Sequence, residues 1–224
     1  MNILAIDTSD LVFSAALSSK NGFWYSEIDA GARHSELLMD CIDELFTSSG
    51  IKPNELGLIA CMRGPGSFTG LRIGFSAAKG LAMALGIPIS SINTLDCLAY
   101  SLEFWPGIVI PAIDAKKGCF FTALYRGKER LTEYMDAPPE KIAEKVKSIL
   151  SFPEEPAVIT GSGSCLLYPF LEVSIPGTRL DTQSCRGRAR ELMEIVKDAK
   201  ICGNCTLDSG PLYIRRSDAE LKNG

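Results

Sequence analysis

The chain has 224 residues, a formal net charge of −4 and a hydrophobic content of 46%. This length is sufficient for two compact lobes, and the composition is that of an ordinary globular protein. The acidic balance argues against a protein whose main task is to grip nucleic acid, because that task requires a basic face. The sequence shows neither a signal-peptide pattern nor an apolar run long enough to span a bilayer. We therefore expect a soluble, cytoplasmic protein with no membrane partner.

The first half of the chain alternates short apolar strands with apolar-faced helices. Strands are predicted over residues 2–7, 13–18, 23–28, 56–61 and 88–92, and helices over residues 34–46, 69–85 and 94–103. The order is βββαβα, followed by one more strand and one more helix. Residues 104–107 look like a junction, so we expect a first lobe of residues 1–104. Residues 105–224 would form a second lobe, whose C-terminal tail may extend back to the first.

The second half restarts the same pattern. Strands are predicted over residues 108–114, 119–125, 130–135 and 157–160, and helices over residues 138–150 and 188–200. Residues 4–17 align without gaps to residues 111–124, and an Ala, an Ile, an Asp, a Phe, an Ala and a Leu coincide. The shared residues and the shared element order predict an internal duplication into two βββαβα halves.

A glycine-rich stretch, RGPGSFTGLRIG at residues 63–74, joins the strand over residues 56–61 to the helix over residues 69–85. It is not a P-loop, because no Gly-Lys-Ser/Thr follows at the required spacing. Two interpretations remain open. The stretch is either a strand-to-helix turn with close helix packing, or an anion site at a helix N-terminus.

The helix over residues 69–85 is apolar nearly all round, with Gly, Gly, Ala, Leu and Ala at positions 70, 74, 77, 81 and 84. Such a helix is buried on most sides, and small side chains let another backbone approach closely. We therefore predict that one side of it faces a second protein. A parallel row at positions 71, 75, 78, 82 and 85 is equally apolar, so the sequence leaves open which row faces the core.

Two other features have weaker signals. The basic cluster over residues 186–190 is interpreted as a solvated turn that opens a helix. The pair Cys202 and Cys205 forms a C-x-x-C motif without a second ligand pair at zinc spacing, so neither a metal nor a redox role is predicted for it.

Two lobes that each open with an Ile-Asp hairpin resemble the fold of actin, the sugar kinases and the heat-shock ATPases. The resemblance implies an α/β fold in which Asp7 and Asp114 flank a nucleotide cleft. The first hairpin lacks the glycine that lets backbone N–H groups close on a phosphate. We therefore expect a vestigial cleft that has no catalytic residues, needs no cofactor and binds nucleotide only weakly.

Four stretches resemble the TsaB (YeaZ) family: ILAIDTS at residues 3–9, HSELL at 34–38, GPGSFTGLRIG at 64–74 and PLYIR at 211–215. The resemblance implies a non-catalytic scaffold in the synthesis of threonylcarbamoyladenosine next to the tRNA anticodon. In that system TsaC makes threonylcarbamoyl-adenylate, TsaD transfers the group to adenosine, and TsaE is an accessory ATPase. The implied partners are TsaD and TsaE, a second copy of the chain when TsaD is absent, and tRNA only through the complex.

The resemblance also suggests where TsaD binds. TsaD holds a metal with two histidines four residues apart, but here Leu38 takes the second position after His34, so no metal is expected. The partner-binding residues predicted on the two helices are His34, Leu38, Cys41, Gly70, Arg72, Gly74, Ala77 and Leu81. The alternative functions are an ATP-dependent phosphotransferase using Asp7 and Asp114, and a protease, for which neither a triad nor a metal site is seen.

Overall fold

The computed structural model describes residues 1–198, Gly210 and Ile214. The described residues divide into two compact units, one of residues 1–97 with 186–198 and one of residues 98–185. The Cys202–Cys205 pair and most of the motif at residues 211–215 lie outside the described residues.

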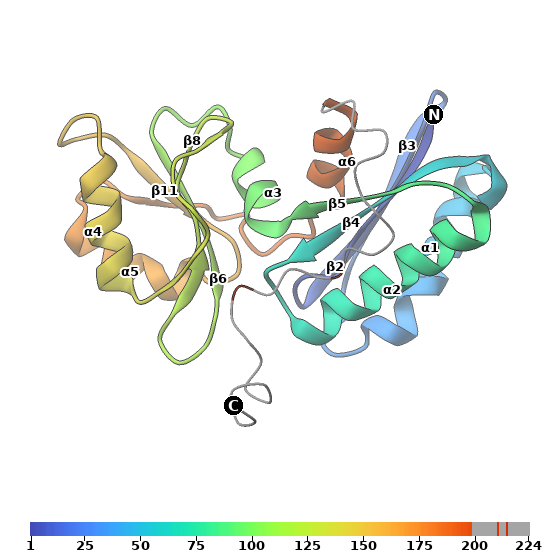
Figure 1. Ribbon diagram of the computed structural model, residues 1–224, viewed down its shortest axis with the longest axis horizontal. Coiled ribbons are helices and arrows are strands. Elements are labelled where there is room, and N and C mark those ends of the chain that lie inside the picture. The colour runs from blue at the N-terminus through green and yellow to red at the C-terminus, as the bar shows by residue number, and fades with distance from the viewer. Residues whose placement is uncertain (199–209, 211–213, 215–224) are drawn as a thin grey trace. The chain divides into compact units, whose positions relative to one another are not determined.

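The first unit is a five-stranded sheet with helices on both faces (Figure 1). Its elements are β1 (Asn2–Asp7), β2 (Val12–Ser19), β3 (Gly22–Asp29), α1 (His34–Ser49), a short 3-10 turn (Pro53–Glu55), β4 (Leu56–Gly64), α2 (Phe68–Leu85), β5 (Ile89–Asn93) and α6 (Ala189–Asp198). The strand order is β3-β2-β1-β4-β5; β1 runs antiparallel to β2 and parallel to β4. The helix α3 (Thr94–Tyr100) contains the boundary between the two units.

Alternation along the strands gives this sheet two apolar faces. Leu4, Ile6 and Phe13 point to the face covered by α1 and α2, where they pack with buried residues such as Leu38 and Phe75. The opposite face is covered by α6, and its cluster joins Ile3, Ala5, Ala16, Leu58 and Ala60 to Ala189, Leu192, Met193 and Val196. Burial of the side chains on both faces of a sheet is typical of strands that are enclosed by helices.

The second unit follows the same path. Its elements are β6 (Ile108–Asp114), β7 (Phe120–Thr122), β8 (Tyr125–Arg126), β9 (Glu129–Arg130), β10 (Met135–Ala137), α4 (Pro139–Ile149), β11 (Ala157–Thr160), α5 (Ser164–Ser174) and β12 (Arg179–Leu180). The strand order is β10-β7-β6-β11-β12, with β8 paired to β6 and to β9. The strand β6 runs antiparallel to β7 and parallel to β11, as β1 does to β2 and β4. The predicted duplication of a βββαβα half is therefore present in the topology.

The structure differs from the sequence-based expectations at three places. The helix α5 and the strand β12 were not predicted, and the strands expected over residues 119–125 and 130–135 are each shorter and divided. The helix expected over residues 188–200 is present as α6, but it packs on the first unit because its apolar face matches that sheet. The unit boundary lies at residue 97 rather than 104. No helix in the described part of the chain is long and apolar enough to cross a membrane.

Candidate functional site

Asp7, the first predicted cleft residue, ends β1 and is only 2% exposed. Its Oδ1 accepts hydrogen bonds from the Ser9 backbone N–H at 3.0 Å and from the Ser9 hydroxyl at 2.6 Å, and its Oδ2 accepts one from the Arg188 N–H at 2.8 Å. Burial raises the pKa of Asp7 above its ordinary value, although the bonds from Ser9 and Arg188 act to lower it. The Asp7 carboxylate therefore has a structural role: it connects the end of β1 to the backbone at Ser9 and Arg188.

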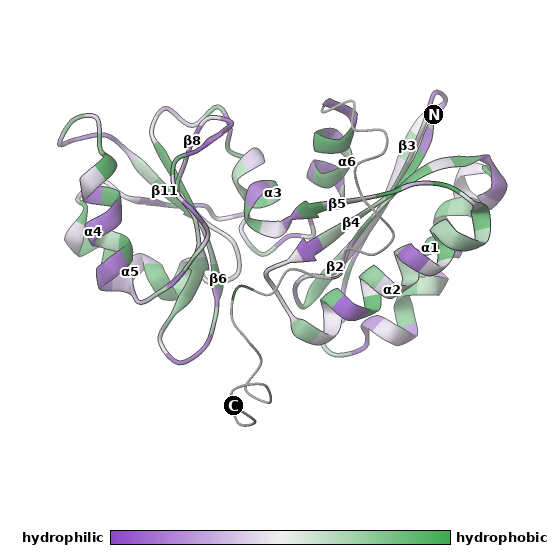
Figure 2. Ribbon diagram, in the orientation of Figure 1, coloured by the Kyte–Doolittle hydropathy of each residue, from purple (hydrophilic) through white to green (hydrophobic). Residues whose placement is uncertain are grey.

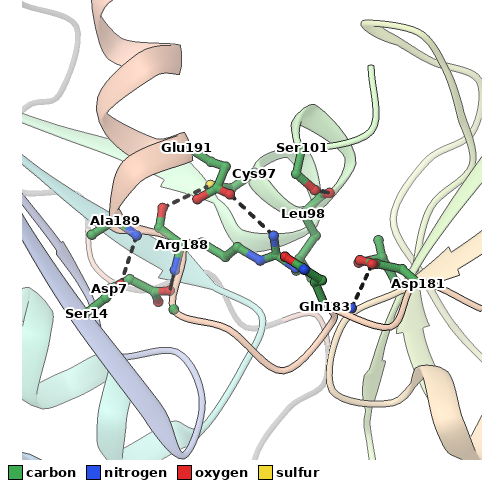
Figure 3. A network of polar contacts seen from close by, with 12 residues as sticks. Asp7, Ser14, Cys97, Leu98, Ser101, Asp181, Gln183, Arg188, Ala189 and Glu191 are labelled. Carbon is green, nitrogen blue, oxygen red and sulfur yellow. Dashed lines mark hydrogen bonds and ion pairs between the residues drawn. The ribbon is translucent and has the colours of Figure 1, made fainter. Parts of the chain in front are cut away.

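The start of α6 is bound to the sheet through its backbone. Three successive N–H groups each donate to a side chain of a different strand: Gly187 to Glu27 of β3 at 3.1 Å, Arg188 to Asp7 of β1 at 2.8 Å, and Ala189 to Ser14 of β2 at 2.9 Å. Figure 3 shows the second and third of these bonds. The Arg188 and Ala189 N–H groups are two of the donors at the start of α6 that have no intrahelical partner.

This arrangement corrects the interpretation of residues 186–190 as a solvated turn. Arg188 is 5% exposed, and its guanidinium donates to Glu191 Oε1 at 3.4 Å (Figure 3). Arg186 and Arg190 are exposed on either side of it. The interpretation failed because the backbone of the cluster is bound by Asp7, Ser14 and Glu27, which lie far away in the sequence.

The glycine-rich turn packs against the end of β1. A Cβ at Gly66 would overlap the carbonyl oxygen of Ser9, a Cβ at Gly70 that of Thr8, and a Cβ at Gly74 the hydroxyl of Thr8. Two hydrogen bonds hold the contact: the Ser67 N–H donates to the Ser9 carbonyl at 2.7 Å, and the Thr8 hydroxyl donates to the Gly70 carbonyl at 2.7 Å. Of the two interpretations left open by the sequence, the structure supports close packing. The glycines are required by the approach of α2 to the β1–β2 hairpin.

Asp114, the second predicted cleft residue, is in a different environment. It ends β6, its side chain is 26% exposed, and it accepts from the Lys116 backbone N–H at 2.7 Å and from Lys116 Nζ at 2.8 Å. Partial desolvation acts to raise the pKa of Asp114, but the bonds from Lys116 outweigh it and lower the pKa below its ordinary value. Asp7 and Asp114 belong to different units, so the predicted cleft stays a prediction.

Three buried polar atoms near the ends of β4 and β5 were missed by the sequence-based reasoning. Arg63 Nε, Asn93 Nδ2 and Thr94 Oγ1 have no hydrogen-bond partner among the described residues. Arg63 and Asn93 lie at the carboxyl ends of β4 and β5, and Thr94 follows β5 directly. This position at the carboxyl end of parallel strands was the signal that could have identified them. Groups of three or more metal-ligating side chains are not found in the described part of the chain.

The structure also decides which side of α2 faces the core. Leu71, Phe75, Ala78 and Ala82 are buried, and Gly70 and Gly74 are buried beside them against Thr8. Ala77 and Leu81 are only partly buried, and Arg72 is exposed with its guanidinium 3.9 Å above the ring of Phe68. The small residues that do face outward are spaced by four: Ser76, Gly80 and Ala84.

Five of the eight predicted partner-binding residues are therefore placed in the core of the first unit. On α1 these are His34, Leu38 and Cys41, and on α2 they are Gly70 and Gly74. The side chain of His34 is buried against Phe13, with ring centroids 5.8 Å apart, and its Nε2 lies 2.7 Å from the Asp10 carbonyl oxygen. The apolar row of α1 and the glycines of α2 are the sides that the sheet and Thr8 cover, and contact of these five residues with a partner stays a prediction.

The ribbons of α1 and α2 alternate between hydrophobic and hydrophilic residues (Figure 2). Met39 is 44% exposed, Phe68 43% and Met83 63%. We call these three residues, together with the exposed side of α2 at Arg72, Ser76, Gly80 and Ala84, the α1–α2 outer face. Ile73, Ala77 and Leu81 lie at its edge, where they are partly buried and pack against the core. Single exposed hydrophobic residues are normal on a protein surface, but three large ones on two neighbouring helices, together with a row of small residues, make this face a candidate interaction surface.

Comparison with known proteins agrees with this fold. A family model described as TsaD, tRNA N6-adenosine threonylcarbamoyltransferase, matches residues 28–188. The tRNA threonylcarbamoyladenosine biosynthesis protein TsaB of Bacillus subtilis (strain 168) is 30% identical, and the match covers 99% of this chain and 97% of that protein. The chain belongs to the TsaB family. The solved structure of YeaZ from Pseudomonas aeruginosa has a TM-score of 0.80 and 25% identity, and the match covers 95% of this chain and 99% of that one. The family and the fold class expected from the sequence are confirmed.

Similarity to the transferase itself is more limited. A tRNA N6-adenosine threonylcarbamoyltransferase of Jannaschia sp. is 28% identical, and the match covers 67% of this chain but 45% of the transferase. The match thus spans nearly the whole of a TsaB protein and less than half of the transferase.

Proposed function

We propose that this member of the TsaB family is a non-catalytic subunit that binds TsaD and supports transfer of the threonylcarbamoyl group to tRNA. The curated relatives that match it over most of its length are named for the biosynthesis of threonylcarbamoyladenosine in tRNA. The match of a TsaD family model to residues 28–188 supports a partnership between two proteins of related fold.

The observation that carries the proposal is the α1–α2 outer face. Ser76, Gly80 and Ala84 let a second backbone approach α2 closely, while Met39 and Met83 supply apolar area at the edges. Interface cores are enriched in Met and aromatic residues and depleted of charge. We propose that TsaD packs on this face, that a second copy of the chain takes its place when TsaD is absent, and that TsaE and tRNA engage the assembled complex.

The environment of Asp7 supports the non-catalytic assignment. An Asp that handles metal-bound phosphates needs a carboxylate open to the ligand, whereas both oxygens of Asp7 accept hydrogen bonds from Ser9 and Arg188. The competing proposal, an ATP-dependent phosphotransferase, predicts that the purified chain hydrolyses ATP above background. We expect no such hydrolysis.

Two neighbouring alanines of α2 provide the test of TsaD binding. Ala77 is partly buried at the edge of the α1–α2 outer face, whereas Ala78 is 0% exposed. We expect Ala77→Glu to leave a cooperatively folded protein that no longer co-purifies with TsaD, because a charge would be buried without a partner in the interface. Ala78→Glu places the same charge in the core and should unfold the first unit. Circular dichroism melting and the size of the TsaD complex are the measurements.

A matched control introduces the same charge elsewhere. Val173 on α5 is 83% exposed and belongs to the second unit, so Val173→Glu should fold and bind TsaD normally. If Ala77→Glu folds and binds TsaD as well as Val173→Glu does, the outer face is not the interface and the proposal is wrong.

A further inference from the structure

A pocket of about 280 Å³ lies between the edge strand β3 and the start of α6, away from the α1–α2 outer face. Its lining residues are Tyr25, Arg186, Gly187, Arg190 and Glu191, all within the first unit. Ligand pockets for whole small molecules typically measure about 300–1,000 Å³. The pocket is therefore of a size for one residue of a polymer or for a small anion with an attached ring.

Tyr25 and Arg190 line the pocket, and Phe23 lies beside them, next to the lining residues. The rings of Phe23 and Tyr25 are stacked with centroids 6.4 Å apart, and the Arg190 guanidinium lies 5.1 Å from the Phe23 centroid and 5.8 Å from that of Tyr25. Phe23 is 39% exposed, so its ring remains open to a further stacking partner. Aromatic rings and guanidinium planes are the surfaces on which unpaired RNA bases stack.

The charged groups of the pocket divide into donors and one acceptor. Arg186 and Arg190 present guanidinium groups, which match phosphate geometry. The N–H of Gly187 is already taken by Glu27, so the guanidinium groups, not the helix terminus, would hold an anion. On the acidic side, Glu191 Oε1 accepts from Arg188, while its buried Oε2 has no partner among the described residues.

This donor and acceptor set distinguishes between ligand classes. An acidic peptide side chain offers only acceptors, and these would meet the unpaired Glu191 Oε2 unfavourably. A nucleotide offers a phosphate to the arginines, a flat base to Phe23, and a donor for Glu191 in the form of a base amine or a ribose hydroxyl. We propose that this pocket binds one nucleotide of an RNA, with its phosphate on Arg186 and Arg190, its base on Phe23 and a donor of its base or ribose on Glu191. The inference builds on the proposed function, in which the RNA is the tRNA substrate.

The test uses the full-length chain and a fluorescein-labelled tRNA anticodon stem-loop, with affinity measured by anisotropy between about 50 and 200 mM KCl. A single nucleotide contact gives weak binding, so the low-salt end supplies the signal. Arg186→Gln and Arg190→Gln should each lower the affinity and reduce the slope of log K against log[KCl] by about 0.7–1. Phe23→Ala should lower the affinity about tenfold and leave the slope unchanged, because stacking releases no counterion.

The control is Arg179→Gln, which removes an exposed arginine from β12 of the second unit and should change neither quantity. Arg186→Gln, Arg190→Gln and Phe23→Ala proteins that bind like the Arg179→Gln protein would overturn the inference. Displacement of the stem-loop by AMP at equal nucleotide concentration would overturn the RNA assignment in favour of a free nucleotide, and displacement by polyglutamate would assign the pocket to an acidic peptide.

The two proposals can fail separately. Arg190→Gln lies away from the α1–α2 outer face, so this variant should still co-purify with TsaD. Retained TsaD binding with unchanged RNA affinity would reject the pocket alone. RNA affinity that depends on Arg190 in a chain that does not bind TsaD would reject the proposed function alone.

Discussion

The two units share one topology but use it differently. In both, a central strand ends in an Asp, and a glycine-containing turn leading to a helix packs against that end: Gly70 meets Thr8 in the first unit, and Gly163 meets Asp114 in the second. The first unit then covers the second face of its sheet with α6, and the cap of α6 buries Asp7. In the second unit Asp114 stays partly exposed and is paired with Lys116 of the same hairpin.

The difference shows what a duplication preserves. Strand order and the close contact between turn and hairpin are kept in both halves, because they are backbone features that define the fold. The roles of individual side chains are not kept, because they depend on what covers the sheet end. The same residue type at equivalent positions is therefore a buried anchor in one unit and part of a surface ion pair in the other.

The largest loss of stability should come from removing the Asp7 carboxylate, and removal of the Asp114 carboxylate provides the comparison. Asp7→Ala leaves the buried donors of Ser9 and Arg188 unsatisfied and should lower the free energy of unfolding by about 2 kcal/mol or more. Asp114→Ala breaks a solvent-screened pair and should lower it by less than about 1 kcal/mol. Urea unfolding measures both, and equal losses would contradict the comparison.

The same variants also bear on the non-catalytic assignment. In a reconstituted tRNA modification assay, folded Asp114→Ala protein should keep most of the rate. A loss of about a hundredfold or more would have the size expected for a missing catalytic acid or base and would favour the phosphotransferase.

A second effect concerns the contact between turn and hairpin in the first unit. Gly70→Ala should destabilise the chain by about 1–3 kcal/mol, because its Cβ would overlap the Thr8 carbonyl oxygen. Gly80→Ala is the matched control in the same helix: no atom lies within 4 Å of its Cβ, so it should stabilise the helix by about 0.5–1 kcal/mol. Thermal melting of both variants is the measurement, and two changes of the same sign would mean that close packing is not the reason for the glycine.

A smaller effect is the opposite pH dependence of the two carboxylates. Burial raises the pKa of Asp7 above its ordinary value of 3.8, so the folded state holds a proton that the unfolded state releases. Its contribution to stability therefore falls as the pH rises from 3.8 through the folded pKa. The pKa of Asp114 is lowered below 3.8, because the bonds from Lys116 outweigh partial desolvation, so its contribution is present above 3.8 and is lost as the pH falls through the folded value.

Asparagine variants separate these two terms. As the pH rises from acidic to neutral, the stability of Asp7→Asn relative to the unaltered chain should improve. The relative stability of Asp114→Asn should worsen as the pH rises through the acidic end of the same range, because the unaltered chain gains the contribution of Asp114 there. Denaturant unfolding across the pH series provides the comparison. The reverse trend for Asp7→Asn would mean that the hydrogen bonds from Ser9 and Arg188 outweigh burial.

The smallest expected effect is that of metal removal. Neither unit brings together a metal-ligating cluster within its described residues. Elemental analysis of protein purified without chelator should give zinc and iron well below one atom per chain, and EDTA should leave the melting temperature unchanged. About one metal per chain would point to the Cys202–Cys205 pair.

Much of the fold could be predicted because its strands are apolar runs bounded by turns and its first helices have clear apolar faces. The helix α5 was not predicted; it follows Gly161 and Gly163 directly and contains Pro169, and glycine and proline both disfavour a helix in a sequence pattern. The side of α2 that faces the core could not be predicted, since both rows are apolar and the decisive partner, Thr8, is distant in sequence. For the same reason the amphipathic pattern of α6 predicted burial but not the sheet that buries it.

The candidate site was less predictable than the fold. The motifs identified the family and the helices α1 and α2, but not which side chains are exposed. His34 was predicted at a partner surface from a family motif and Gly70 from the row of small residues, whereas the structure buries both within the first unit. The pocket beside β3 could not be predicted, because Phe23 and Arg190 are brought together only when residues 186–198 return to the first sheet.

That return has a consequence for how the chain is made. During synthesis the strands β1 to β5 leave the ribosome first, but the helix that covers their second face and binds Asp7 is encoded after the whole second unit. At about 5–20 residues per second, the first sheet waits on the order of ten seconds with Ile3, Ala5 and Leu58 uncovered. The elements of the second unit over residues 98–185 are continuous in sequence and can pack before the first unit is complete. The N-terminal unit is thus the last to finish folding, and a message cut short within the second unit yields a sheet with one bare apolar face.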